Sequence, residues 1–410
     1  MPIKQQKNSP PAGARIASLL FCLAFAGGLQ AEVEFEWDGF GSIGAGLLDD
    51  NSINKTNANP HNLFDEDLQF DVDSRLGVQG TLFANDAFSA TVQIVAHSAE
   101  EEDAELEWAY LSYDPNKNLK IRAGRQRRPF FALTDVLPVG YVYPWIRPPL
   151  EVYRRDTQLF DELDAIDLLY TTRLGSWDIT TEIYVGQSSG EVEINSGEDS
   201  DFKTRDDVGI ILDFQMDWLS LQFGYHDSPD IDVESSKDLE TLFDNLRLAG
   251  FSSVADAMEN KGFEGELFSF AAGIDYQNWL FNTEVIHLPL DGGLVPEASA
   301  WYIMGGRRFG PWTAHLTYGE LERKADHDFS QPIAELAAIV GSPGNAGLLA
   351  LAGGVDQAIA ALEAEQSSYT LGLRYDFAQP VSIKAEYQYI RDEKFDLTNN
   401  LFSFVVDFLF

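Results

Sequence analysis

The chain ends in the stretch LFSFVVDFLF, residues 401–410. Counting back from Phe410, every second residue is apolar, whereas the alternate positions include Ser403 and Asp407. A period of two indicates a β-strand with one apolar face and one partly polar face. A strand of about ten residues with one apolar face can cross a bilayer, provided that a closed barrel satisfies its backbone hydrogen bonds. The alternative is a soluble edge strand, which would leave an apolar edge open to aggregation.

The amino terminus has the three parts of an export signal. A basic stretch is followed by an apolar run over residues 16–26, which is too short to span a bilayer as a helix. Residues 29–31 form a plausible cleavage site. We therefore expect a secretory signal peptide over residues 1–31 and one barrel domain over residues 32–410. Cys22, the one cysteine, lies in the leader, so the mature chain is expected to form no disulfide and no cysteine metal site.

The composition excludes several classes of protein. The 410 residues include 28 Lys and Arg against 66 Asp and Glu, a net charge of −38, which disfavours nucleic-acid binding because phosphates require a basic patch. The 28 Phe, 15 Tyr and 8 Trp are too many for a disordered acidic chain. No phosphate loop, dinucleotide fingerprint or zinc motif occurs, so we predict no cofactor and no metal site.

Short turns recur between stretches of alternating apolar and polar residues. They are rich in Gly, Pro, Asn and Asp, which favour tight turns. The seven turns are 84–86, 114–118, 174–176, 215–217, 277–278, 310–311 and 378–380. They join fourteen strands, and a first strand over 33–47 and a last over 399–410 raise the count to sixteen. We predict an all-β fold, a transmembrane antiparallel β-barrel with short periplasmic turns and long extracellular loops.

Aromatic residues mark one end of the predicted barrel. Four of the short turns are followed by tryptophan, which is typical of an interfacial aromatic girdle. The predicted membrane girdle consists of Trp177, Trp218, Trp279, Trp312 and Phe410.

Alternation also assigns the inner face. The lumen-facing positions of the strand that begins at Val381 are predicted to be Ser382, Lys384, Glu386 and Gln388. Dry burial of such charged groups would be very costly, so the lumen is expected to be wet. A barrel of sixteen strands leaves a water-filled channel.

The connection over residues 131–165 differs from the other long loops. Its stretch Val136-Leu137-Pro138-Val139 is too apolar for a solvated flap, and Pro148-Pro149 makes a strand improbable. Packing inside the barrel mouth satisfies both observations. An external loop packed on its neighbours remains the alternative.

The segment just before this loop is the most basic of the predicted mature chain. If its apolar positions face outward, then Lys120, Arg122 and Arg128 face the lumen. The same alternation turns Arg125 and Arg127 toward lipid, which is costly in mid-membrane. Two explanations stay open: a bulge changes the alternation, or both residues lie above the hydrocarbon.

The leader, the polarity of the hairpins, the tryptophan-headed strands and the terminal Phe together resemble the trimeric, sixteen-stranded Gram-negative porins. The resemblance implies a homotrimer in the outer membrane, assembled by the barrel-assembly machinery through the carboxyl-terminal strand. It also implies a third loop that narrows the pore and faces basic wall residues. That wall would be Lys120, Arg122, Arg128, Arg75, Arg374 and Lys384. The loop would present Asp135, Asp161, Glu162 and Asp164 with the aromatic residues Tyr141, Tyr143 and Trp145. Ordinary lumen salt bridges without a selective role are the alternative.

Two departures limit this resemblance. The loop lacks the Pro-Glu-Phe-Gly-Gly-Asp type of sequence of enterobacterial general porins, and the lysine abundance of phosphate-selective porins is absent.

The predicted function is a channel for passive diffusion of small hydrophilic solutes and ions, with a preference for cations. Acidic loops such as residues 100–103 would concentrate cations, bridge to lipopolysaccharide through divalent ions, or simply be solvated. Two alternatives are a substrate-specific channel for a small organic acid or sugar, in which aromatic loop residues including Tyr153 stack on the ligand, and a structural or adhesive barrel. We predict no enzyme, because adjacent His226-Asp227-Ser228 does not define a triad. Short helices are expected in the loops 239–260 and 333–363.

Overall fold

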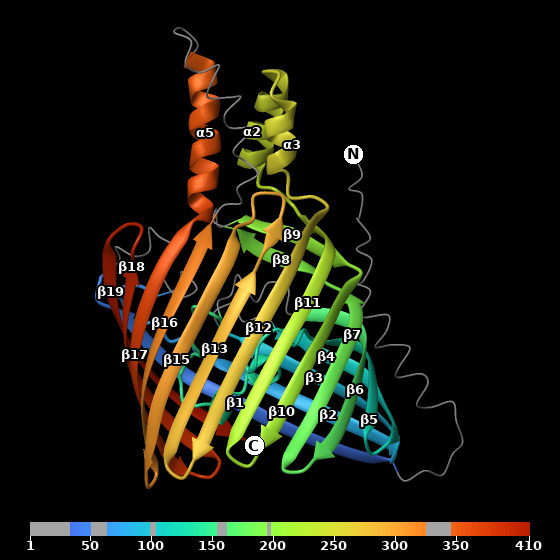
Figure 1. Cartoon of the computed structure of the whole chain (residues 1–410). Helices are drawn as coiled ribbons and strands as arrows, with labels where there is room; N and C mark the ends of the chain where they lie inside the picture. Colours follow the sequence, from blue (N-terminus) through green and yellow to red (C-terminus); the bar gives the residue numbers. More distant parts are fainter. Residues whose placement is uncertain (1–32, 51–63, 99–103, 154–161, 195–197, 325–345) are drawn as a thin grey trace, which may run out of the picture.

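A computed structural model describes residues 33–50, 64–98, 104–153, 162–194, 198–324 and 346–410. Nineteen strands form one antiparallel sheet, and three of them, β8, β9 and β14, are short additions beside the main strands. The other sixteen close into a barrel, as the sequence predicts (Figure 1). The predicted leader lies outside the described residues.

The bounds of the elements follow the turns found in the sequence. The first eight barrel strands are β1 (Glu34–Leu48), β2 (Arg75–Asn85), β3 (Phe88–His97), β4 (Ala104–Asn116), β5 (Leu119–Arg127), β6 (Glu162–Leu174), β7 (Trp177–Gln187) and β10 (Asp207–Met216). The second eight are β11 (Leu219–Val233), β12 (Phe263–Tyr276), β13 (Trp279–Leu288), β15 (Glu297–Phe309), β16 (Trp312–Lys324), β17 (Ala364–Ala378), β18 (Val381–Asp392) and β19 (Leu397–Leu409). The additions are β8 (Ser189–Ile194), β9 (Glu198–Arg205) and β14 (Leu290–Asp291). The helices are η3 (Thr134–Val136), η4 (Gly140–Val142), α2 (Lys237–Leu248), α3 (Ser252–Met258) and α5 (Ala346–Leu362).

The barrel closes where its first and last strands meet. β1 pairs with β19 from Phe40 opposite Leu409 to Leu48 opposite Leu401. The backbones of Gly39 and Phe410 extend the pairing with two hydrogen bonds of 2.8 and 2.9 Å. Closure removes both free edges of the sheet, so the terminal stretch is a barrel strand rather than an exposed edge.

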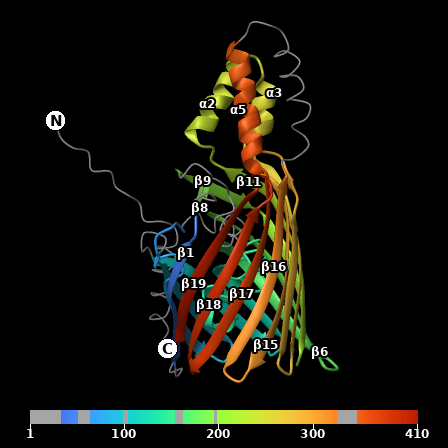
Figure 2. The ribbon, with the colours of Figure 1, turned by 90° about the vertical axis from the view of Figure 1, so that its left-hand side faces the viewer.

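The two ends of the barrel differ. All seven predicted short turns join paired neighbouring strands at one end, here called the short-turn end. Long connections and the helices α2, α3 and α5 lie at the other, here called the long-loop end (Figures 1 and 2). The predicted helical content of both loops is confirmed, with residues 333–345 outside the described part. Among the described residues, no helix is both long and apolar enough to cross a membrane.

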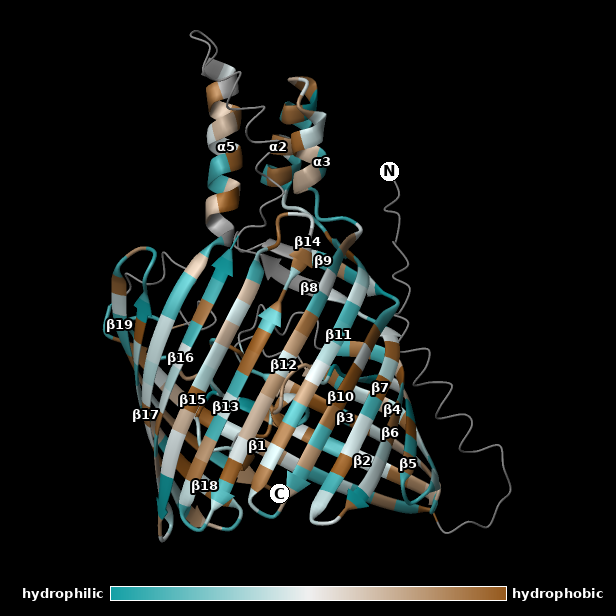
Figure 3. Cartoon of the chain, viewed as in Figure 1, coloured by the Kyte–Doolittle hydropathy of each residue, from teal (hydrophilic) through white to brown (hydrophobic). Residues whose placement is uncertain are grey.

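The two faces of the wall alternate as predicted. On β18, Ser382, Lys384 and Glu386 are buried, whereas Tyr387 is 37% exposed. On β19, Phe402 and Phe404 are about half exposed between buried positions. Apolar and polar residues follow one another along the strands (Figure 3), and the exposures place apolar side chains on the outer wall and polar groups on the inner wall.

A bulge on β4 provides a partner for one of the two problematic arginines. Glu107 has no partner in the β3–β4 ladder, because Gln93 pairs with Trp108 and the next position pairs with Leu106. Its carboxylate receives two hydrogen bonds from the Arg127 guanidinium, and both side chains are buried. Arg125 keeps the outward register at the long-loop end of β5. There it ion-pairs with Glu162 at 2.8 Å and with Asp164 at 3.2 Å.

The helices at the long-loop end pack mainly on one another. Phe243 and Leu246 of α2, Met258 of α3 and Val355 of α5 share one apolar cluster with Leu294. Ser236 caps α2 by accepting a hydrogen bond from the Leu239 amide. We call α2, α3 and α5 the helical cap.

Candidate functional site

The segment over residues 128–153 lies against the inner side of the wall. It leaves β5 and passes the far wall of the barrel, where the Ala132 amide donates to Glu284 of β13 at 3.0 Å. Further along, the Ile146 amide donates to Glu386 of β18 at 2.7 Å. It then returns, so that the Tyr153 hydroxyl also donates to Glu284. We call this segment the inner loop.

An apolar and aromatic core fixes the inner loop to the wall. Phe131, Tyr143, Trp145 and Tyr153 are at most 5% exposed and pack on inward residues of β12, β13, β15 and β16. The Trp145 indole N–H donates to the Thr317 hydroxyl at 2.8 Å. This packing explains why the loop is apolar where a solvated flap would be polar.

Three of the predicted wall cations hold the inner loop through its main chain and one tyrosine. Lys384 is 1% exposed; its ammonium donates to the carbonyls of Gly140 and Trp145, each at 2.6 Å, and ion-pairs with Asp407 at 2.8 Å. Arg374 donates to the carbonyls of Tyr141 and Tyr143 at 2.6 and 3.0 Å. Arg75 donates to the Tyr143 hydroxyl at 2.7 Å. These cations bind carbonyl and hydroxyl oxygens of the loop. The resemblance to porins had implied that they would face the acidic side chains of the loop.

A different group of charges lines the wall formed by β5, β6, β7 and β10. Arg122 donates from Nε to Asp167 at 2.7 Å and from a terminal nitrogen to Glu182 at 2.9 Å. Asp135, in η3 of the inner loop, is exposed and close enough to interact electrostatically with Arg122 and Asp167. Asp213 of β10 is close enough to interact with Asp135 in the same way. The structure thus brings together Arg122 and Asp135 of the predicted site and adds three acids.

Other predicted site residues lie elsewhere. Lys120 is 48% exposed and lies 3.9 Å from Asp114, near the end of β4 at the short β4–β5 turn. Glu162 and Asp164 belong to β6, where they pair with Arg125, so their assignment to the loop is corrected. β6 continues beyond the apolar band of the outer wall toward the long-loop end. Its outward-facing residues in that part are the acids Glu162 and Asp164. Asp161 lies outside the described residues.

Arg128 is buried beside the start of the inner loop. Its guanidinium ion-pairs with Asp207 and donates to Ser188 at 2.7 Å and Ser228 at 3.1 Å, and both ionic side chains are at most 1% exposed. It stacks over the Phe130 ring at 5.0 Å. This arginine therefore anchors the base of the loop instead of facing the lumen water.

We expect Arg128→Met to lower the free energy of unfolding by about 3 kcal/mol, because it leaves the Asp207 carboxylate buried without its counter-ion. Urea titration of the folded barrel, followed by tryptophan fluorescence, measures this change. Arg173→Met is the control: Arg173 pairs with Asp178 at 2.6 Å but is 72% exposed, so solvent screens the pair and its loss should change the free energy of unfolding far less. Equal losses in both variants would contradict the prediction.

Sequence reasoning missed the acids that organise the site. Asp407 and Asp73 hold Lys384 and Arg147, and Asp167 holds Arg122. The alternation of each strand places Asp407 and Asp167 on the inner face. No sequence signal specifies which cation each of these carboxylates meets.

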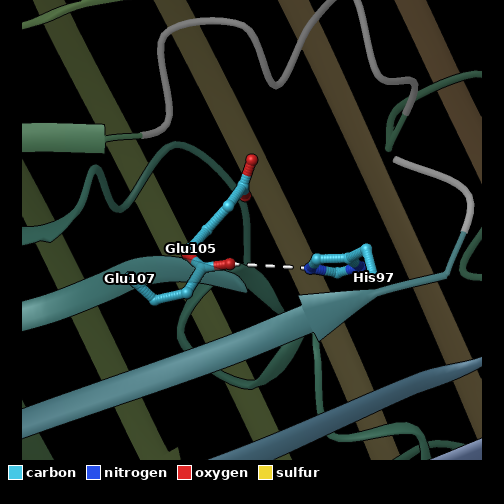
Figure 4. Close-up of side chains that lie close together, drawn as sticks. All are labelled: His97, Glu105 and Glu107. Atoms are coloured by element: carbon cyan, nitrogen blue, oxygen red, sulfur yellow. Dashed lines mark ion pairs between the residues drawn. The ribbon is translucent and has the colours of Figure 1, made fainter. Parts of the chain in front are cut away.

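Two acidic clusters at the long-loop end are also tied to arginine. Figure 4 shows His97, Glu105 and Glu107 at the ends of β3 and β4, with the His97 imidazole 3.7 Å from Glu107. The Arg127 guanidinium already occupies both oxygens of Glu107. Likewise, Arg205 bridges Asp230 and Asp232 at 2.7 Å each.

Comparison with known proteins identifies the family. The family model described as Gram-negative porin matches residues 17–395. This chain belongs to the Gram-negative porins. As a member, the porin is an outer-membrane channel protein, and the family indicates a channel rather than an enzyme. No curated protein sequence matches it significantly.

Solved structures share the fold of this porin at low identity. The outer membrane channel DcaP of Acinetobacter baumannii matches with a TM-score of 0.56 and 10% identity, covering 93% of this chain and 99% of that one. The anion-selective porin from Comamonas acidovorans has a TM-score of 0.55 and 10% identity, covering 92% and 100%. The trimer form of OmpT from Vibrio cholerae has a TM-score of 0.52 and 11% identity, covering 92% and 99%. At these identities the likeness extends to the fold alone.

The predicted girdle residues of the porin share one end and one face. Trp218, Trp279, Trp312 and Phe410 are 43–55% exposed on the outer wall near the short-turn end. Trp177 lies on the same face and contacts Phe214 edge to face at 6.4 Å.

Proposed function

We propose that this porin lets small hydrophilic solutes and ions diffuse passively and prefers cations. The observation that carries the proposal is the cluster of Asp135, Asp167, Glu182 and Asp213 around Arg122. Arg127 also interacts with Asp135, but both oxygens of Glu107 already bind its guanidinium. The wall cations Lys384, Arg374 and Arg75 are bound to the inner loop, so they contribute less to the field in the lumen. The balance of charge beside η3 is therefore negative, which concentrates cations.

The arrangement of the inner loop supports a passage along the other wall. Its contacts lie mainly on β12–β19 together with β1 and β2. On the adjoining part of the wall, β2 and β3 carry two hydrogen-bonded pairs of uncharged side chains. The hydroxyls of Thr81 and Thr91 are 3.2 Å apart, and the Gln93 amide nitrogen donates to Gln79 at 3.0 Å. The proposed passage lies between η3 and the wall from β3 to β10, with polar groups on one part and acids on the other.

The burial of the loop aromatic residues disfavours the substrate-specific alternative. Tyr143, Trp145 and Tyr153 are each 2% exposed. Their ring faces are covered by the wall, so they are unavailable for stacking on a ligand in this conformation. Tyr141 is partly exposed, but the Arg374 guanidinium covers its ring at 4.9 Å.

The proposed assembly is a homotrimer inserted by the barrel-assembly machinery. The description of OmpT from Vibrio cholerae as a trimer supports the oligomeric state. The exposed Phe402, Phe404 and Phe410 of the terminal strand support recognition of that strand during insertion. The acidic long-loop end would bind lipopolysaccharide through divalent cations.

Planar bilayers with a salt gradient test the function directly. We expect conductance steps in multiples of three and a reversal potential directed toward the cation equilibrium potential. An anion-directed potential would overturn the cation preference. Silent membranes despite a folded barrel would overturn the diffusion channel and favour the structural or adhesive alternative.

A further inference from the structure

Arg307 lies on the outer wall near the short-turn end. On β15 it is directly opposite Trp279 of β13 and Ala314 of β16. Phe309 follows two positions later, on the same face, before the short turn. Residues opposite one another in an antiparallel ladder share a face, and the exposed Trp279 and Phe309 identify it as the outer one. Arg307 is therefore a cation within the aromatic girdle.

Two aromatic rings hold the Arg307 guanidinium. Its central carbon is 4.8 Å from the Trp279 ring centroid and 5.0 Å from that of Phe309. Within the described part of the chain, no carboxylate ion-pairs with it. Other outward cations of the barrel strands lie at the long-loop end and are paired: Arg125 with Glu162 at 2.8 Å, Lys324 with Glu322 at 2.7 Å, and Arg391 with Glu393 at 3.3 Å.

An unpaired cation is unexpected on this face. The chain has a net charge of −38, so acidic residues are plentiful, and a positive charge facing lipid is costly unless it reaches the interface or a counter-ion. The rings orient the guanidinium by cation–π contact and leave its N–H donors without a protein carboxylate. These donors are therefore open to an anion from outside the protein.

Small residues leave room beside Arg307. A Cβ added at Gly305 would meet no other atom within 4 Å, which means open space on the membrane side of Arg307. Gly305 lies directly opposite Phe281 and Leu316, and Leu316 is 55% exposed. The small residues Gly305 and Ala314 therefore leave a shallow depression on the outer surface, and the larger apolar side chains of Phe281 and Leu316 border it.

We propose that Arg307 binds the phosphate of a phospholipid in the leaflet at the short-turn end, with one acyl chain lying over Gly305 and Ala314. The planar guanidinium fork matches phosphate oxygens and makes charge-assisted hydrogen bonds to them. The acyl chain fills the space between Phe281 and Leu316, where it contacts apolar side chains instead of neighbouring lipid. The site thus consists of Arg307, which binds the phosphate, and an apolar depression, which binds the acyl chain.

Arg307→Gln tests the phosphate contact. The purified protein, as trimer or monomer in a neutral detergent, is titrated with phosphatidylglycerol and with diacylglycerol that has the same acyl chains. Native mass spectrometry measures the bound lipid. We expect Arg307→Gln to weaken phosphatidylglycerol binding about tenfold, as for loss of a charged hydrogen bond, and to leave diacylglycerol unchanged. Arg307→Lys should retain most of the affinity.

Arg308→Gln is the matched control, because it removes the same charge from the next residue, which faces inward and pairs with Asp275 at 2.6 Å. It should bind phosphatidylglycerol as the unmodified protein does. Equal weakening in both variants would assign the effect to overall charge and overturn the proposal. Unchanged binding in Arg307→Gln, or equal binding of both lipids by the unmodified protein, would overturn it as well.

Gly305→Leu tests the acyl contact separately. It should weaken long-chain phosphatidylglycerol several-fold and leave dihexanoyl phosphatidylglycerol unchanged, because the short chains do not reach the filled space. Equal weakening of both lipids would contradict the placement of the chain.

Discussion

Replacing Lys384 with methionine should enlarge the pore and destabilise the barrel at the same time. The ammonium of Lys384 binds the carbonyls of Gly140 and Trp145 and also Asp407 of β19. The Lys384 side chain is 1% exposed. Lys384→Met removes three contacts and leaves Asp407 buried without its cation. We expect a loss of about 3–5 kcal/mol in the free energy of unfolding. We also expect a larger single-channel conductance, because η4 keeps the Arg374 contact but loses the Lys384 contact that holds it to the wall.

A second substitution separates the two effects. In Lys384→Met with Asp407→Leu, no buried charge is left unpaired, so most of the stability should return. The carbonyls of the inner loop still lack their donor, so the enlarged conductance should remain. Lys120→Met is the control, since Lys120 also faces the lumen but touches only the short turn. A double variant with the original conductance would show that Lys384 does not hold the loop.

Asp135→Asn should reduce the preference for cations more than any other single neutralisation in the lumen. Asp135 is the exposed acid of the inner loop and lies near Asp167 and Asp213. One unit charge acting over about 4 Å in water contributes about 1 kcal/mol, which is about a fivefold change in local cation concentration. We therefore expect the ratio of cation to anion permeability to fall about fivefold at low salt.

Salt concentration provides an internal check on that result. The Debye length falls from about 10 Å at 0.1 M to about 3 Å at 1 M, so the effect of Asp135→Asn should shrink markedly in 1 M salt. Asp256→Asn removes the same charge from α3 of the helical cap and should change the reversal potential little. If the two variants behave alike, the selectivity arises from the acidic exterior and not from the lumen.

The strands and their faces could be predicted because each depends on neighbouring residues. A period of two places Ser382, Lys384 and Glu386 inside without knowledge of any other strand, and turn residues mark where each hairpin reverses. The prediction that Glu162 and Asp164 belong to the loop was wrong. At the long-loop end, beyond the apolar band of the outer wall, a strand no longer alternates apolar and polar residues. Acidic residues on the outer face there resemble those of a loop.

The pairing within the lumen could not be predicted. Lys384 and Gly140 are 244 residues apart, and alternation specifies the face of each strand but not its height in the barrel. The resemblance to porins therefore implied wall cations that face loop acids. In the structure three of those cations hold the loop, and the bulged residue Glu107 binds Arg127. Both outcomes depend on contacts between distant segments.

The seam between β1 and β19 has a consequence for biogenesis. Ser42 donates a hydrogen bond to Asp407, a contact spanning 365 residues, and every backbone bond of the seam is similarly long-range. Until those strands meet, the sheet has two bare edges, each able to pair with a foreign strand. Almost the whole chain must cross the periplasm before either edge can be covered. Long-range β pairing is slow, so the unfinished sheet requires protection until its first and last strands have met.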